Sequence, residues 1–200
     1  MQSQFIEEFK YIPKEDYKSL KDVCTLITDG THNPPKFVDS GIPFILVSNI
    51  TENVVTYDTP KYITEETYDI LMKRTPIEKG DVLLSTVGSY GHPAVVSDDK
   101  KFAFQRHIAH LKPNRELLDS RFLHMAVLST DVQEQIEVSV LGVAQKTLNL
   151  SAIKQIKIPV PSFERQKQFI AFVDQSDKSK FVVEQLLNIF HHIHLTVKED

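Results

Sequence analysis

Short apolar runs alternate along this chain with polar, turn-rich segments, a pattern that is typical of a mixed α+β domain. Runs with strong strand preference, each bounded by glycine, proline or charged residues, lie at 43–47, 82–85, 94–96, 102–104 and 108–111. Hydroxyl, amide and imidazole side chains stand beside glycine at 27–35, 85–92, 105–110 and 142–148. Loops of this kind on a rigid scaffold commonly bind a polar ligand, so we predict a β-rich domain whose loops recognise a polar ligand.

Apolar residues at helical spacing predict four helices, at 19–27, 64–73, 119–129 and 130–140. We expect Gly30 to end the first of them. Thr64 is the expected N-cap of the second. Thr130 and Gln133 have the spacing of a capping box for the fourth. His107 and His110 alternate along the adjoining strand, so we expect both imidazoles to be solvated or to face a ligand.

The C-terminal segment predicts one long helix, beginning after Ser162 and running to about residue 197 without glycine or proline. At ~1.5 Å per residue it would span roughly 50 Å, more than a small domain can cover. Val182, Leu186, Ile189 and Ile193 follow a heptad-like spacing. The helix either folds back on its own domain or forms an arm that pairs with another helix. Its many apolar residues favour the arm.

The composition is that of an ordinary folded protein, with 41% hydrophobic and 25% charged residues among 200. A single cysteine excludes an internal disulfide, and we find neither a signal peptide nor a long apolar run. We therefore expect a cytoplasmic protein without membrane contact. The net charge of −4 argues against binding to a polyanion. A local excess of cations leaves a basic patch open, at Lys100, Lys101, Arg106, Lys112, Arg115 and Arg121.

The usual catalytic motifs are absent. Asn33-Pro34-Pro35 begins like the motif of amino-methyltransferases, but Lys36 replaces the aromatic residue that would stack on the target base. The turn at 88–91 is too short for a phosphate loop, and no histidine pair has zinc-hydrolase spacing. Glu78-Lys79 lacks the spacing of a nuclease strand motif. We predict no catalytic residue, no metal site and no cofactor.

Four stretches together resemble the target-recognition domain of type I restriction–modification specificity subunits. They are 29–32 (Asp-Gly-Thr-His), 41–45, 77–83 and 142–148, followed at 158–161 by Ile-Pro-Val-Pro and then by the long helix. The resemblance covers about residues 19–195. It implies a lead-in segment at 1–18, a target-recognition domain at 19–161 and a spacer helix at 162–200. Family members usually hold two of each, so we expect a half-subunit, a truncated gene product or an artificially shortened chain.

The resemblance also implies a division of labour. The recognition domain would bind double-stranded DNA at one half of a split site, and the helix would dock methyltransferase subunits. Those subunits carry S-adenosylmethionine, and a motor-nuclease subunit carries ATP and magnesium. We expect this chain to pair as a homodimer and to read an inverted-repeat site. The expected helix contacts are Phe172, Val182, Leu186, Ile189 and Ile193.

Side chains that suit DNA are concentrated in the predicted loops. Amides pair with adenine and arginine with guanine, whereas lysines serve phosphates. The strongest group is Gln105-Arg106-His107, at the end of a strand. The full set of expected DNA contacts is Thr31, His32, Asn33, Lys36, Ser48, Asn49, Ser85, Thr86, Ser89, Tyr90, Gln105, Arg106, His107, Gln145 and Lys146.

Two other classes remain open from the residues. The chain could be a nuclease or a fragment of a methyltransferase-nuclease, or an interaction protein that joins a restriction complex without reading DNA.

Overall fold

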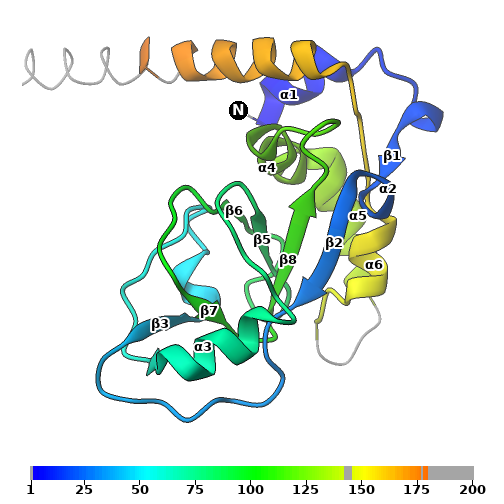
Figure 1. Ribbon diagram of the computed structural model, residues 1–200. Coiled ribbons are helices and arrows are strands. Elements are labelled where there is room, and N and C mark those ends of the chain that lie inside the picture. The colour runs from blue at the N-terminus through cyan, green and yellow to red at the C-terminus, as the bar shows by residue number, and fades with distance from the viewer. Residues whose placement is uncertain (1, 142–145, 177, 180–200) are drawn as a thin grey trace, which may run out of the picture.

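A computed structural model describes residues 2–141, 146–176, 178 and 179, and it divides into two lobes (Figure 1). The helix lobe holds a four-stranded antiparallel sheet in the order β2-β8-β5-β6. These strands are β2 Cys24–Asp29, β8 Ile108–Pro113, β5 Val82–Ser85 and β6 Pro93–Val95. The α+β class predicted from the sequence is confirmed.

The small lobe holds a three-stranded sheet in the order β4-β3-β7, made of β4 Tyr62–Ile63, β3 Ile42–Ile45 and β7 Ala103–Phe104. It also contains the short 3-10 helix η2 (Val47–Asn49) and helix α3 (Glu65–Met72). Thr64 caps α3 as predicted, because its side chain accepts a hydrogen bond from the Thr67 amide. Tyr68, Leu71 and Met72 pack this helix against β3 and β7.

The four-stranded sheet is buried on both faces. Val82 and Leu84 of β5 pack into the core of the helix lobe, whereas Leu83 between them packs toward the small lobe. β8 is buried on both faces in the same way, so polar residues in it need internal partners. His110 is fully buried and its Nε2 lies 2.7 Å from Oδ2 of Asp81. The expectation of a solvated or ligand-facing His110 is therefore wrong.

The segment 19–27 differs from its prediction. Only α2 (Leu20–Val23) is helical, and β2 follows at once and pairs with β8, Ile27 opposite Leu111. The apolar positions suit a helical face, but β-branched residues and the open edge of β8 favour a strand. Gly30 consequently ends a strand. A Cβ there would overlap the carbonyl oxygens of Phe104 and Gln105, so the backbones meet too closely for any side chain.

Helices α4 (Ser120–Leu128), α5 (Thr130–Val140) and α6 (Leu150–Gln155) complete the helix lobe. The predicted capping box of α5 is wrong. Ser129 is the N-cap, with its Oγ accepting from the Val132 amide. The Gln133 side chain instead donates to the carbonyl oxygens of Val127 and Gly91, which ties α5 to the β5–β6 loop.

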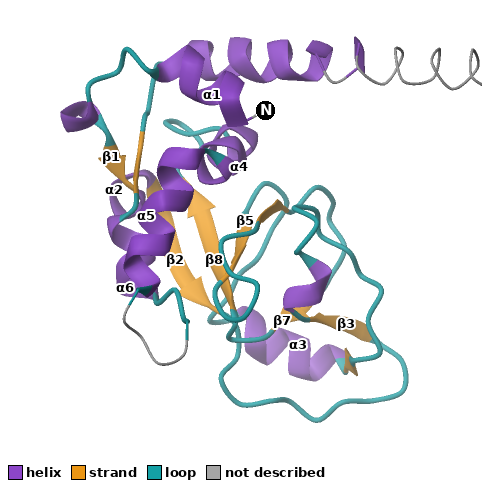
Figure 2. Ribbon diagram, turned by 180° about the vertical axis from the view of Figure 1, so that it is seen from behind, coloured by secondary structure: helices purple, strands orange, loops and turns teal. Residues whose placement is uncertain are grey.

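The two ends of the domain lie together (Figure 2). β1 (Lys18–Ser19) pairs with β9 (Lys157–Ile158) in an antiparallel two-stranded sheet. Before β1 come α1 (Gln2–Phe9) and the 3-10 helix η1 (Lys14–Asp16). After β9, residues 163–176 are helical, and Oγ of Ser162 accepts a hydrogen bond from the Arg165 amide, as expected of its N-cap.

An aromatic cluster fastens both terminal helices to the domain. The Phe5 ring centroid lies 5.0 Å from that of Phe9, 5.3 Å from Phe122 and 5.5 Å from Phe169. Ile170 and Val173 are buried beside them. Residues 163–176 thus pack on their own domain, the alternative that the sequence favoured less.

Of the expected partner contacts on the C-terminal helix, Phe172 is 55% exposed. Val182, Leu186, Ile189 and Ile193 lie outside the described residues. Within the part that is described, no helix is long and apolar enough to cross a membrane.

Candidate nucleic-acid interface

Strand direction brings the polar loops to one end of the four-stranded sheet. β2 ends there at Asp29 and β5 ends there at Ser85, while β6 and β8 begin there at Pro93 and Ile108. We call this the loop end. The turn 105–107, the loop 86–92 and the start of the β2–β3 connection all leave the sheet at this end.

The turn Gln105–His107 crosses from the small lobe to the helix lobe and is held on both sides. The Arg106 amide donates to the Thr31 carbonyl oxygen at 3.1 Å. The Thr86 amide donates to the His107 carbonyl oxygen at 2.9 Å. Thr31 also forms a parallel bridge with Gln105. The backbone beneath these side chains is thus fixed, as a reading site requires.

A cavity of about 240 Å³ opens beside this turn, lined by residues that include Asp29, Arg106 and His107. The segment after α5 closes its other side, because Val87 bridges Thr147 and the Leu148 amide donates to the Thr86 carbonyl oxygen at 2.9 Å. Lys146 is exposed at the start of that segment, next to Thr147. Gln145 lies outside the described residues.

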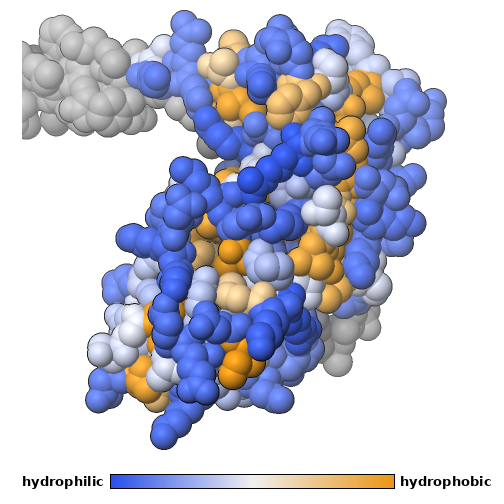
Figure 3. All heavy atoms as spheres, viewed as in Figure 1, coloured by the Kyte–Doolittle hydropathy of each residue, from blue (hydrophilic) through white to orange (hydrophobic). Residues whose placement is uncertain are grey.

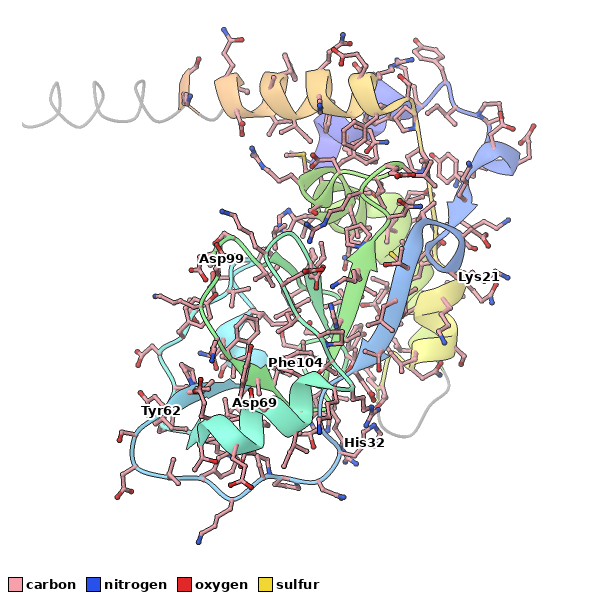
Figure 4. All side chains as sticks on the ribbon, in the orientation of Figure 1. Lys21, His32, Tyr62, Asp69, Asp99 and Phe104 are labelled. Carbon is pink, nitrogen blue, oxygen red and sulfur yellow. The ribbon has the colours of Figure 1, made fainter. Side chains whose placement is uncertain are left out.

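Asp29 organises the edge of this cavity. Its Oδ1 accepts from an Arg74 terminal nitrogen at 2.7 Å, and its Oδ2 lies 2.8 Å from Nε2 of His32. His32 appears near the junction of the lobes in Figure 4. Sequence reasoning missed Arg74, which follows α3 and lies 45 positions from Asp29. No local motif marks it, because only the docking of the lobes brings it here.

Arg106 differs from every other arginine. The chain has five, and four pair with carboxylates: Arg74 with Asp29, Arg115 with Asp81 and Glu78, Arg121 with Asp174, and Arg165 with Glu8. Among the described residues no carboxylate forms an ion pair with Arg106. Its Nε instead donates to Nε2 of His107 at 3.2 Å. Burial, and then the charge of Arg106, lower the pKa of His107, which keeps that imidazole neutral at pH 7.

The six lysines and arginines between 100 and 121, which the sequence suggested as a possible basic patch, do not form a continuous basic surface. Lys101 pairs with Glu65 on α3, and Arg121 pairs with Asp174 on the C-terminal helix. Lys112 approaches the buried Asp81 from β8. Lys112 and Arg115 share the carboxylates of Glu78 and Asp81. Folding therefore pairs four of these six cations with acidic side chains, and among the described residues Arg106 and Lys100 form no ion pair.

Three of the expected DNA contacts are buried residues. The buried Asn49 side chain accepts from the Leu46 amide at 2.9 Å and donates to the Asp58 carbonyl oxygen at 2.8 Å. Ser85 is fully buried, and its Oγ accepts from the His92 amide. Thr86 is buried as well. Burial and internal hydrogen bonds argue against direct contacts with DNA for Asn49 and Ser85. Thr86 lines the cavity beside the turn 105–107, and its contact with DNA stays a prediction.

The other expected contacts remain accessible to different degrees. The hydroxyl of the half-buried Tyr90 donates to the Glu137 carboxylate on α5, at 3.0 and 3.1 Å. Ser89 is exposed and lies 3.1 Å from Nε2 of His92. Ser48 is exposed on η2 in the small lobe. Asn33 and Lys36 are exposed on the β2–β3 connection.

Groups suited to catalysis are scarce in the described part of the chain. No cluster of three or more histidine, cysteine, aspartate or glutamate side chains there could hold a metal ion. Burial raises the pKa of the Cys24 thiol to about 12, so it is not a thiolate nucleophile at neutral pH.

Polar residues dominate the visible face of the small lobe (Figure 3).

Known proteins match this chain along most of its length. The family model of the type I restriction modification DNA specificity domain matches residues 14–188. The specificity subunit of the Escherichia coli type I restriction enzyme EcoBI is 31% identical over 146 residues, which are 73% of this chain and 31% of that relative. The chain thus spans about a third of that relative's length.

Solved structures share the fold. The HsdS subunit from Thermoanaerobacter tengcongensis superposes with a TM-score of 0.61 at 18% identity, over 92% of this chain and 44% of that one. A chain from a study of complex assembly and conformational transition of the type I R-M system gives 0.62 at 18% identity, over 92% and 46%. From the extent of the family match, this chain belongs to the type I restriction modification DNA specificity domain family.

Proposed function

We propose that this chain is the DNA-reading specificity subunit, or half of one, of a type I restriction–modification system. Its single target-recognition domain binds double-stranded DNA at one half of a split site, with the loop end in the major groove. The observation that carries this proposal is Arg106, an exposed arginine without a carboxylate partner on a turn fixed by backbone hydrogen bonds. Arginine is the usual reader of guanine in that groove.

Neighbouring cations have a different part in this proposal. Lys146, exposed beside the cavity, and Lys36, exposed on the β2–β3 connection, contact phosphates, which fixes register without adding sequence information. Asn33 and Gln105 are amides that suit adenine. The net charge of −4 makes sequence-independent binding weak, so partner subunits supply cationic surface.

We infer that the chain performs no chemistry of its own and works in the cytoplasm with methyltransferase subunits and a motor-nuclease subunit. Those partners carry S-adenosylmethionine, and ATP with magnesium. Two copies pair through the C-terminal helix and read an inverted repeat. In support, Phe172 is 55% exposed although Phe169 and Val173 on the same helix are buried. The alternatives of a nuclease, a methyltransferase-nuclease fragment or a pure interaction protein have no support in the comparisons.

The test is selection of preferred sequences from a random double-stranded DNA library, at low salt, by the full chain alone and mixed with a type I methyltransferase subunit. We expect one enriched half-site, and Arg106→Ala should weaken preference at one guanine by about 1–3 kcal/mol. Unfolding by urea should change little, because the side chain is exposed.

Arg165→Ala is the matched control, since this arginine is also exposed but pairs with Glu8 at the opposite end of the molecule. It should leave the enriched half-site unchanged. Absence of any enriched sequence, with or without the methyltransferase subunit, would reject the proposed function.

A further inference from the structure

We propose that His107 is a positioning residue that aims the Arg106 guanidinium at a guanine, and that DNA preference at this base step therefore depends on a neutral His107. The inference rests on the proposed function. It adds a division of roles between two adjacent residues and a dependence on pH.

The hydrogen bond sets the direction. Nε of Arg106 carries a hydrogen and donates to Nε2 of His107 at 3.2 Å, so that ring nitrogen must be the unprotonated one. The proton of the neutral imidazole then sits on Nδ1. With Nε engaged, the two terminal nitrogens of the guanidinium stay free as a fork, which matches O6 and N7 of guanine.

The surroundings explain why an imidazole, rather than a carboxylate, orients the Arg106 guanidinium. A carboxylate would hold an arginine more strongly, as Asp29 holds Arg74 at 2.7 Å, but it would also place a negative charge against the DNA. A neutral ring orients Arg106 and leaves its full charge for the ligand. The His107 backbone is itself fixed, because its carbonyl oxygen accepts from the Thr86 amide.

Few charges act on this ring. Arg106 is adjacent, and Asp29 lines the same cavity from the end of β2 with its carboxylate engaged by Arg74 and His32. Burial, and then the charge of Arg106, hold the pKa of His107 below its ordinary value of 6.5. The ring therefore accepts at pH 7. Protonation at lower pH turns Nε2 into a donor and sets two cations side by side, which releases Arg106.

The first experiment needs no DNA. Nitrogen-15 NMR of the imidazoles in the full chain should show His107 protonated on Nδ1 and not on Nε2 at pH 7. Arg106→Ala should raise the pKa of His107 but leave it below 6.5, since burial is the larger cause. Finding the proton on Nε2 at pH 7 would overturn the proposed arrangement, whatever the chain binds.

The second experiment measures the ratio of affinities for the enriched half-site and for the same site with its guanine replaced. His107→Phe keeps the ring shape and removes the acceptor, so the ratio should fall about tenfold, within the range of one bidentate contact. His107→Gln offers an amide oxygen that accepts but does not titrate. It should restore most of the ratio and make it independent of pH between 5 and 7.5.

The wild-type ratio should instead fall as the pH drops through the pKa of His107. His32 and His92 are further histidines at the loop end, and His107→Gln separates His107 from them because it leaves both in place. An unchanged ratio in His107→Phe, with a normal unfolding transition, would reject the role of His107 while leaving the proposed function standing. No preference in the wild-type chain would reject the proposed function itself.

Discussion

The two ends of the four-stranded sheet are built on opposite principles. At the helical end, where β8 runs toward α4, three phenylalanine rings from α1, α4 and the C-terminal helix pack around the ring of Phe5, with their centroids 5.0–5.5 Å from its centroid. At the loop end the same strands release polar turns around a cavity of about 240 Å³. One end removes apolar surface from water, and the other leaves polar side chains exposed around the cavity.

The difference teaches how the domain combines a stable core with a variable surface. Burial of a phenylalanine contributes about 1.5–3 kcal/mol, and the helical end holds several. The loop end is held mainly by backbone hydrogen bonds between neighbouring turns, such as that from Arg106 to Thr31. Side chains at the loop end can therefore be replaced without loss of the backbone hydrogen bonds that hold the turns. Substitutions at the two ends should therefore affect different measurements.

The largest effect on stability should follow Phe122→Ala, because Phe122 is fully buried in the aromatic cluster. We expect the free energy of unfolding, measured in urea, to fall by about 3–5 kcal/mol. The DNA preference of the folded protein should stay the same. Val138→Ala, at an exposed position on α5, is the control and should change stability by less than about 0.5 kcal/mol.

Gly30→Ala should couple the two measurements. The added Cβ would overlap backbone carbonyl oxygens at the turn that carries Arg106. We therefore expect the free energy of unfolding to fall by about 3 kcal/mol and the DNA preference to weaken. Gly88→Ala meets no atom within 4 Å but has φ +74°, so it should cost about 1–2 kcal/mol. Equal loss of preference in both variants would argue against the role of the close approach.

Asn49→Ala should cost about 2 kcal/mol, because it leaves the Leu46 amide and the Asp58 carbonyl oxygen without their partner. Sequence selection by this variant, assayed as for Arg106→Ala, should return the wild-type half-site. A shifted half-site would return Asn49 to the set of DNA contacts.

The smallest effect should come from Arg165→Gln. The ion pair with Glu8 at 3.2 Å joins the C-terminal helix to α1, but both side chains are about half exposed. We expect a loss of about 0.2–1 kcal/mol that shrinks further at high salt. Urea unfolding at two ionic strengths measures it, and a larger loss would mean that α1 depends on this pair more than on its phenylalanines.

Local rules predicted the elements whose local and tertiary preferences agree. α3 begins after Thr64 as its cap and acidic first turn indicate, and β5 follows its turn at Gly80. They failed at β2, where positions 20, 23, 24 and 27 suit a helix as well as a strand. The open edge of β8 decided between them, and an edge 80 residues away leaves no mark on the local pattern.

The sequence predicted which loops form the candidate site, but not which of their side chains are buried, paired or exposed. Asn49, Ser85 and Arg106 look alike in sequence as polar residues beside apolar runs. Only the fold buries the first two and leaves the third without a carboxylate partner. Arg74 shows the reverse case, since the docking of the two lobes brings it to Asp29. Burial and pairing of polar groups depend on contacts between distant segments, which periodicity does not report.

The pairing of β1 with β9 makes the domain a cassette. Lys18 lies opposite Ile158, so the chain enters and leaves through adjacent strands at one narrow neck. A host protein that offered two neighbouring strand ends, with apolar helices beside them to cover Phe122 as α1 and the C-terminal helix do here, could accept the whole domain between them. Exchange at this neck would transfer the turn 105–107 together with the sheet that fixes it.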